Sequence, residues 1–289
     1  MSAPPANVPL RLIRHQGRML KTIARIVLHT ALPRRHAVPR DLVVERTIAP
    51  PSPKLIDRYA AWCGAAERYR MELPPHMVSH WSLPLVSELL LRMPYRLTSV
   101  INQGVTMRVH GPLPRGVPLQ LRASLQSAEE NDGRVRVTVA FVTGTAQRPL
   151  LVETLLHMSF IVRRRRGPKT ERAAQVQPQW QTAGHWRASA RDGLNFALLT
   201  GDFNPIHWCG PLARRSVFGG KVLHGFGSFV RSYEQLERGS FSEIDVRFLR
   251  PVPLPSAVLQ VEQAGAGDDG WRPLRLSDGG IIHLAGRCR

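Results

Sequence analysis

The same order of elements occurs twice along this chain, once in each half. In the first half, an apolar helical run is followed by strand-like runs, at 82–94 and then at 99–109, 118–128, 134–144 and 150–162. The second half repeats this order, with a helical run at 223–237 and strand-like runs at 242–252, 257–266, 271–277 and 280–288. The breaks between the runs carry the Pro, Gly, Asn and Asp residues that turns require. The chain is therefore predicted to be a tandem repeat of one fold.

A helix followed by a meander of long antiparallel strands gives a sheet with one face that can wrap around the helix. This arrangement is the hotdog fold. We therefore predict an α+β tandem (double) hotdog, in which each half is a curved antiparallel sheet around a central helix. The expected segments are a basic helical extension at 1–44, a first hotdog at 45–165, a basic linker at 166–183 and a second hotdog at 184–289.

The formal net charge of +19 is concentrated in two short segments. Residues 1–40 hold eight Lys or Arg and no acid, and residues 163–172 hold six Lys or Arg and one acid. Binding to nucleic acid requires a basic face on a folded module or a known motif, and no zinc-finger, RNP or KH pattern is present. We therefore expect no nucleic-acid partner.

The three cysteines, Cys63, Cys209 and Cys288, are scattered and form no CxxC pair. This pattern argues against a disulfide framework and against a cysteine zinc site. The sequence also lacks an apolar run of about 18 residues and the apolar core of a secretory signal. We expect a cytoplasmic protein.

Residues 8–32 are predicted to form a basic amphipathic helix. Apolar residues recur at helical spacing at Leu10, Ile13, Leu20 and Val27, beside a stripe of Lys and Arg. These apolar residues either cover apolar surface on the hotdogs or contact an anionic membrane. We expect packing on the hotdogs, and peripheral membrane contact through 8–32 is the alternative.

The stretch "LLTGDFNPIHWCGPLA" (198–213) places an acid, an amide and an imidazole within six positions, at Asp202, Asn204 and His207. It follows a predicted helix at 193–202, and Pro205 prevents that helix from continuing. Asp202 and His207 can therefore converge on one water molecule from two sides of a loop. A carboxylate and an imidazole whose environments separate their pKa values can act as an acid–base pair without a metal or other cofactor.

The motif resembles that of the MaoC-like (R)-specific enoyl-CoA hydratase family, also called hydratase-2. The resemblance rests on "TGDFNPIH", on Ala213 after five further residues, and on the downstream "FGGKVLHGF" and "VRFLRPVPLP". The first half is more loosely similar to the non-catalytic hotdog of double-hotdog members. Many relatives have an acid two residues after the histidine, where this chain has Cys209.

The resemblance implies a hydro-lyase that reversibly hydrates trans-2-enoyl thioesters to (3R)-hydroxyacyl thioesters, in fatty-acid or polyketide-type lipid metabolism. The substrate would be an acyl-CoA or an acyl group on an acyl carrier protein, with no metal and no cofactor. The two hotdogs would form a pseudo-dimer within one chain, and further pairing into a homodimer stays open.

Each residue type fits one step of this chemistry. Asp202 and His207 would share the proton transfers, and the backbone N–H of Gly225 at the start of a helix would stabilise negative charge on the thioester oxygen. Residues that support the loop or the substrate are expected to be Asn204, Phe226 and Ser228. His224 is expected to orient its neighbours, and His80, His110 and His157 are expected to be structural.

Two other functions remain open from the sequence. A non-catalytic acyl-thioester-binding or assembly subunit would not need Asp202 and His207, although Cys209 favours it slightly. A hotdog thioesterase would not need the hydratase loop. The first hotdog lacks a G-D-x-N-P-x-H motif, so we expect it to shape the acyl pocket while the second hotdog provides the catalytic loop.

Overall fold

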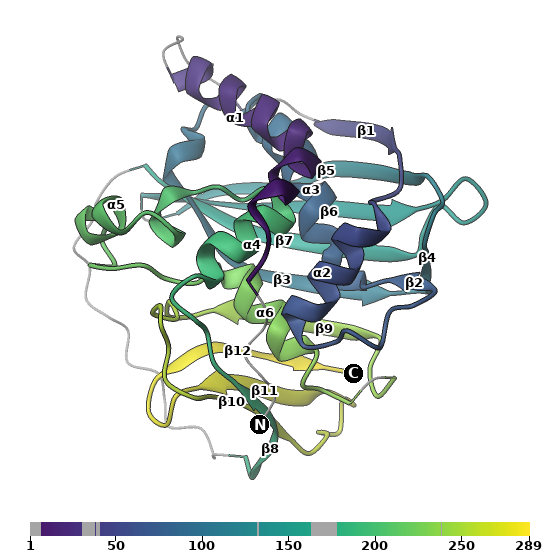
Figure 1. Cartoon of the computed structure of the whole chain (residues 1–289), viewed down its shortest axis with the longest axis vertical. Helices are drawn as coiled ribbons and strands as arrows, with labels where there is room; N and C mark the ends of the chain where they lie inside the picture. The colour runs from purple at the N-terminus through teal and green to yellow at the C-terminus, as the bar shows by residue number, and fades with distance from the viewer. Residues whose placement is uncertain (1–6, 31–37, 39–40, 132, 163–177, 238) are drawn as a thin grey trace.

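The computed structural model describes all of the chain except residues 1–6, 31–37, 39–40, 132, 163–177 and 238 (Figure 1). Most of the predicted basic linker lies outside the described residues. Among the described residues, no helix is long and apolar enough to cross a membrane.

The described residues form a ten-stranded antiparallel sheet and a small two-stranded one. The first half contributes β1 (Val43–Ile48), β3 (Val100–Val109), β5 (Leu119–Asn131), β6 (Arg134–Gly144) and β7 (Val152–Ile161). The second half contributes β8 (Trp180–Trp186), β9 (Glu243–Phe248), β10 (Leu259–Ala264), β11 (Arg272–Ser277) and β12 (Ile282–Cys288). The small sheet pairs β2 (Glu72–Leu73) with β4 (Leu113–Pro114).

The strand order of the large sheet is symmetric about its centre. It runs β1-β5-β6-β7-β3 in the first half and continues β9-β12-β11-β10-β8 in the second. The two halves join where β3 pairs with β9, from Gly104 opposite Arg247 to Arg108 opposite Glu243. A Cβ at Gly104 would collide with the carbonyl oxygen of Val246, so only glycine allows this close strand approach. The predicted double hotdog is confirmed.

The helices lie on one face of this sheet (Figure 1). They are α1 (Gly17–Thr30), α2 (Pro53–Cys63), α3 (Val78–Leu90), α4 (Asp192–Thr200), α5 (Gly210–Arg215) and α6 (Gly225–Tyr233). Short 3₁₀ turns are η1 (Leu10–Gln16), η2 (Pro75–Met77), η3 (Leu97–Ser99) and η4 (Pro205–His207). The central helices α3 and α6 pack in one apolar core that both halves share. The two halves therefore fold as one unit.

The helices before the central ones are also equivalent. Helix α2 in the first half and α4 in the second both end at a glycine in the left-handed conformation, with φ of 88° at Gly64 and at Gly201. Because a residue with a Cβ is strained there, each glycine marks the point where the chain leaves the helix. The segment after each glycine leads to a central helix.

Strand β1 and helix α5 were not predicted from the sequence, and neither were the short strands β2 and β4. Strand β1 is an edge strand whose residues Glu45, Arg46 and Thr47 are exposed, so it lacks a clear apolar alternation. Helix α5 is a short helix that follows the stretch with Asp202 and His207. Strands β1 and β8 begin at Val43 and Trp180, a few residues before the predicted hotdog boundaries.

The N-terminal extension packs on the protein, but not through the predicted face. Leu10, Ile13 and Leu20 are 60%, 41% and 41% exposed, and the side chain of Val27 lies outside the described residues. The buried face includes Val8, Leu12, Gln16 and Met19. This set has helical spacing too, and its polar member is satisfied because the Gln16 amide donates to the Leu198 carbonyl oxygen at 2.9 Å. Apolar spacing alone therefore selected the wrong face.

Candidate active site

The loop that carries Asp202 and His207 is shaped by its own sequence. After the helix stop at Gly201, the Asp202 carboxylate accepts a weak hydrogen bond from the backbone N–H of Asn204, at 3.4 Å. The Asn204 side chain in turn accepts from the N–H of Ile206 at 3.3 Å and caps η4, which has Pro205 at its first position. Asn204 thus supports the loop as a turn residue and points to solvent.

His207 is held in one orientation by its backbone and by its ring. Its Nδ1 lies 2.7 Å from the carbonyl oxygen of Val222, so this nitrogen carries the proton that it donates. When the imidazole is neutral, Nε2 therefore has the lone pair that a base needs. The backbone of His207 lies against Gly193 in the first turn of α4, where a Cβ would collide with the His207 carbonyl.

His224 connects the two predicted catalytic side chains. Its ring stacks on that of His207, with 3.6 Å between centroids. Its Nε2 donates to the backbone oxygen of Asp202 at 3.0 Å and lies 3.9 Å from Asp202 Oδ2. The other side of the ring packs against Phe196, at 4.8 Å. His224 thus lies where a residue that orients the pair is expected.

Burial shifts the pKa values of all three groups. It raises the pKa of Asp202, while His207 and the Asn204 N–H act in the opposite direction. It lowers the pKa of His207, against the effects of Asp202 and of the bond to Val222. It lowers the pKa of His224 strongly, and the neighbouring His207 adds to that effect. The site therefore holds neutral imidazoles beside a carboxyl group that keeps its proton more readily than an ordinary aspartate.

Gly225 begins helix α6 directly after His224. Its N–H belongs to the first turn, whose donors have no partner within the helix, and it lies at the positive end of the helix dipole. The space of its missing Cβ is taken by the ring of Phe248, which would lie 2.6 Å from that atom. The glycine therefore lets Phe248 pack against the start of α6.

The other predicted support residues lie on the core side of α6. Phe226 is buried, with its ring 5.3 Å from that of Phe229. Ser228 is buried one turn after His224, whose carbonyl oxygen accepts from its hydroxyl at 3.5 Å. Both residues are part of α6, and Phe226 belongs to the apolar core.

The structure adds two positions that the sequence reasoning missed. The carbonyl of Val222 fixes the His207 tautomer, and Gly193 admits the His207 backbone. A backbone carbonyl leaves no signal in a sequence, whereas a glycine in the first turn of a helix is a visible one. Among the described residues, no group of three His, Cys, Asp or Glu side chains is placed to hold a metal ion.

Comparison with known families and structures points to one family. The model of the MaoC like domain matches residues 165–275. HtdX of Mycobacterium tuberculosis is similar at 20% identity and a TM-score of 0.67, with 85% of this chain and 99% of that one covered. A comparison with curated proteins finds no match.

Two further solved structures share the fold. A MaoC-like dehydratase of Phytophthora capsici is 16% identical, with a TM-score of 0.69 over 87% of this chain and 95% of that one. The peroxisomal multifunctional enzyme type 2 of Drosophila melanogaster is 18% identical, with a TM-score of 0.62 over 86% of this chain and 48% of that one. Residues 165–275 are therefore similar to the MaoC like domain, and the chain shares the double hotdog fold of these solved structures.

Proposed function

We propose that this protein is a hydro-lyase that interconverts trans-2-enoyl and (3R)-hydroxyacyl thioesters. The observation that carries the proposal is the arrangement of Asp202 and His207, linked through the His224 ring beside the start of α6. Addition of water to an enoyl thioester needs a base, an acid and donors for the thioester oxygen. The site offers a base with a fixed tautomer, a carboxyl group with a raised pKa and a set of backbone donors.

The chemistry assigns one role to each part. His207 Nε2 and the Asp202 carboxyl group orient a water molecule, and the pair takes one proton as the water oxygen bonds to C3 of the enoyl group. The electron pair of the C2=C3 bond moves toward the thioester oxygen, where the N–H of Gly225 and the positive end of α6 stabilise the charge. Return of the proton to C2 completes the addition and restores the pair.

The first hotdog is proposed to shape the acyl pocket, because its helix α3 packs against α4, which leads into the loop. The anionic carrier, either coenzyme A or an acyl carrier protein, would meet the exposed Arg214 and Arg215 at the end of α5. The proposal also includes cytoplasmic fatty-acid or polyketide-type metabolism. It includes a pseudo-dimer within one chain, with or without further pairing into a homodimer.

Two alternatives predict different behaviour. A non-catalytic binding or assembly subunit would bind acyl thioesters without turnover. A thioesterase would release the free thiol of the carrier. The fixed tautomer of His207 favours catalysis over binding alone, because a binding surface does not require an oriented base.

The deciding experiment is spectrophotometric hydration of a panel of trans-2-enoyl-CoA chain lengths, with chiral analysis of the product. We expect loss of the enoyl absorbance and formation of the (3R)-hydroxyacyl product only. Release of free thiol without hydration would identify a thioesterase, and binding without either reaction would identify the non-catalytic alternative.

The same assay across pH tests the role of His207. Protonation of Nε2 removes the base, so kcat/KM should fall as the pH drops through the pKa of this imidazole. Because burial lowers that pKa, activity should persist below 6.5, the ordinary histidine value, before it falls. An acidic limb centred at or above 6.5 would contradict a buried neutral base.

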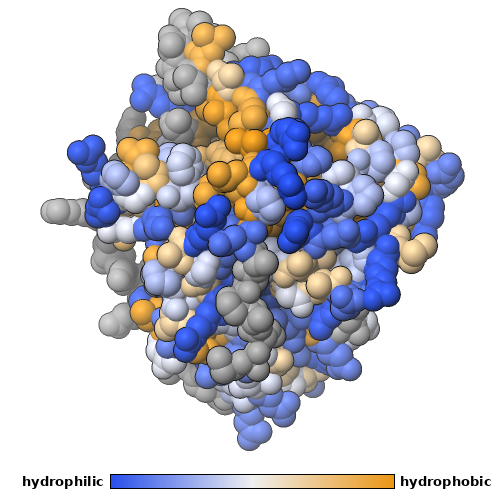
Figure 2. All heavy atoms as spheres, in the orientation of Figure 1, coloured by the Kyte–Doolittle hydropathy of each residue, from blue (hydrophilic) through white to orange (hydrophobic). Residues whose placement is uncertain are grey.

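The exposed face of the extension supports a second proposal, peripheral contact with an anionic membrane. Leu10, Ile13, Leu20 and Leu28 are exposed on the same segment as the basic side chains. Figure 2 shows apolar side chains gathered on the surface over α1. Insertion of exposed leucines and attraction of Lys and Arg to anionic lipid, at about 1 kcal/mol each, would act together.

Two single substitutions separate membrane contact from packing. Leu20→Glu should abolish binding to vesicles that contain phosphatidylserine without lowering the melting temperature, since this side chain is exposed. Leu12→Ala, at a position that is 1% exposed, should cost about 2–5 kcal/mol of stability. Equal vesicle binding by wild type and Leu20→Glu, at low and high salt, would eliminate membrane contact through this face.

A further inference from the structure

The symmetry of the fold defines a position in the first half that is equivalent to the catalytic loop. In the second half, the chain runs from α4 through Gly201 and Asp202 to His224 and then into the central helix α6. In the first half, it runs from α2 through Gly64 and Ala65 to His76 and then, through η2, into the central helix α3. Ala65 thus stands at the position of Asp202, and the shorter connection has no counterpart of η4 and His207.

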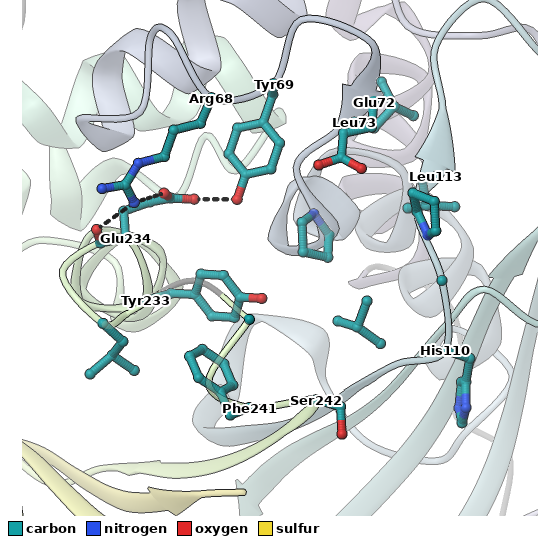
Figure 3. A pocket seen from close by; sticks show the side chains of 16 residues that line it. Arg68, Tyr69, Glu72, Leu73, His110, Leu113, Tyr233, Glu234, Phe241 and Ser242 are labelled. Atoms are coloured by element: carbon teal, nitrogen blue, oxygen red, sulfur yellow. Dashed lines mark hydrogen bonds and ion pairs between the residues drawn. The ribbon is translucent and has the colours of Figure 1, made fainter.

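A cavity of about 390 Å³ lies at this equivalent position (Figure 3). It is bounded by the segment that leads to α3, by the chain after β3, and by the end of α6 with the loop that follows. It is therefore at the opposite end of α6 from the catalytic loop. Much of its wall is apolar, with contributions from Leu73, Val109, Leu113, Leu236 and Phe241.

The polar end of the cavity is closed by a buried network around Glu234. This carboxylate, which is 1% exposed, accepts from Tyr69 at 2.6 Å, from Arg68 at 2.9 Å and meets His76 Nε2 at 2.6 Å. Burial alone would raise the pKa of Glu234, but the hydrogen bonds and charges of these partners outweigh it and lower the pKa. His76 Nδ1 is also engaged, at 3.1 Å from the Tyr59 hydroxyl.

This network distinguishes the cavity from a catalytic site. Both ring nitrogens of His76 have partners, and both oxygens of Glu234 accept hydrogen bonds, so this network presents no base to a water molecule. With alanine at position 65, the equivalent of the catalytic carboxylate is absent. What remains is an apolar recess with a fixed, hydrogen-bonded end, which is suited to hold a chain and not to react with it.

Charged side chains of both signs lie at the rim of the cavity. The Arg68 side chain is 43% exposed and pairs with Glu234. The exposed guanidinium of Arg148 lies so close to Gly111 that a Cβ on Gly111 would be 2.7 Å from it. The Glu72 carboxylate faces the recess in Figure 3. An uncharged chain fits the apolar recess, and an anionic group beside Gly111 would meet the exposed guanidinium of Arg148.

We propose that this cavity is a second, non-catalytic binding site for the acyl chain of an acyl thioester, whose anionic carrier lies at the rim. The choice of acyl thioester rests on the proposed function, because the cavity stands where the internal symmetry would repeat the substrate site. The protein would then hold two acyl chains, one at the loop of Asp202 and His207 and one in this cavity.

Titration calorimetry with octanoyl-CoA, which is saturated and cannot be hydrated, tests the proposal on the full chain. We expect two molecules bound per chain in the wild type and one in Ser242→Trp, which plugs the cavity from an exposed position on its wall. Leu113→Trp fills the cavity from within and should give the same result. Leu150→Trp, at a position that is 46% exposed and outside the cavity, is the matched control and should keep both molecules.

The outcomes separate this inference from the proposed function. The second site would be overturned if the wild type bound one molecule and Ser242→Trp still bound it. It would also be overturned if the wild type and both cavity variants each bound two molecules. If the wild type bound one molecule and Ser242→Trp bound none, the result would support the second site. It would also count against acyl binding at the catalytic loop. Parallel titrations with coenzyme A alone and with octanoate show whether the carrier, the chain or both are recognised. Binding of coenzyme A alone at the cavity would also overturn the proposal.

Discussion

Asp202→Asn and His207→Ala are each expected to lower kcat by at least ~10²-fold, the lower end of the range for general acid–base catalysis. The first change removes the carboxyl group whose pKa burial raises, and the second removes the base whose tautomer Val222 fixes. Neither side chain is part of the apolar core, so both variants should fold. Hydration of a trans-2-enoyl-CoA, with circular dichroism as the check on folding, is the measurement.

Matched surface variants provide the control for this result. Asp269→Asn and His185→Ala change the same residue types at exposed positions in the second half, and should leave kcat unchanged. If Asp202→Asn and His207→Ala both keep activity within a few-fold of an active wild type, these residues are not the proton carriers.

Asp192→Ala is expected to destabilise the protein by about 3–5 kcal/mol, because it leaves a buried guanidinium without its counter-charge. Asp192 is fully buried, and its Oδ2 lies 3.0 Å from Nη1 of Arg231, which is only 4% exposed. The carboxylate also accepts from the indole N–H of Trp62 at 3.0 Å, so it ties the first half to the second. A fall in melting temperature on the order of 10 °C should follow.

The charge itself, and not the lost side chain, should account for most of this effect. Replacing both members of the pair, as Asp192→Leu with Arg231→Met, should recover much of the stability, because no buried charge is then left unpaired. Asp269→Ala removes an exposed aspartate and should cost about 0.5 kcal/mol or less. An Asp192→Ala protein as stable as Asp269→Ala would show that the buried pair contributes nothing.

The loop from Gly201 to His207 was predictable because its signals are local. Gly201 stops a helix, Pro205 prevents its continuation, and Asn204 caps the turn that follows, all within a few residues of Asp202 and His207. The long strands were predictable for the same reason, since each carries its own apolar pattern and its own turn residues. Local rules placed the loop and the sheet without any knowledge of tertiary contacts.

The buried polar pairs could not be predicted in this way. His76 and Glu234 are 158 residues apart in the chain, and Asp192 and Arg231 are 39 apart. Charged residues are usually exposed, so their burial follows only from the packing that brings each pair together. The extension shows the same limit, because Gln16 belongs to its buried face only through the carbonyl of Leu198.

Because β3 and β9 belong to one chain, the two ends of the molecule are free to vary separately. In a dimer of two identical hotdogs, every substitution appears at both ends, so a change that suits one end must be tolerated at the other. Here one continuous chain forms both sides of the join between Gly104 and Arg247. A single mutation can therefore place alanine at position 65 while aspartate remains at 202, and each end of the sheet can acquire a ligand preference of its own.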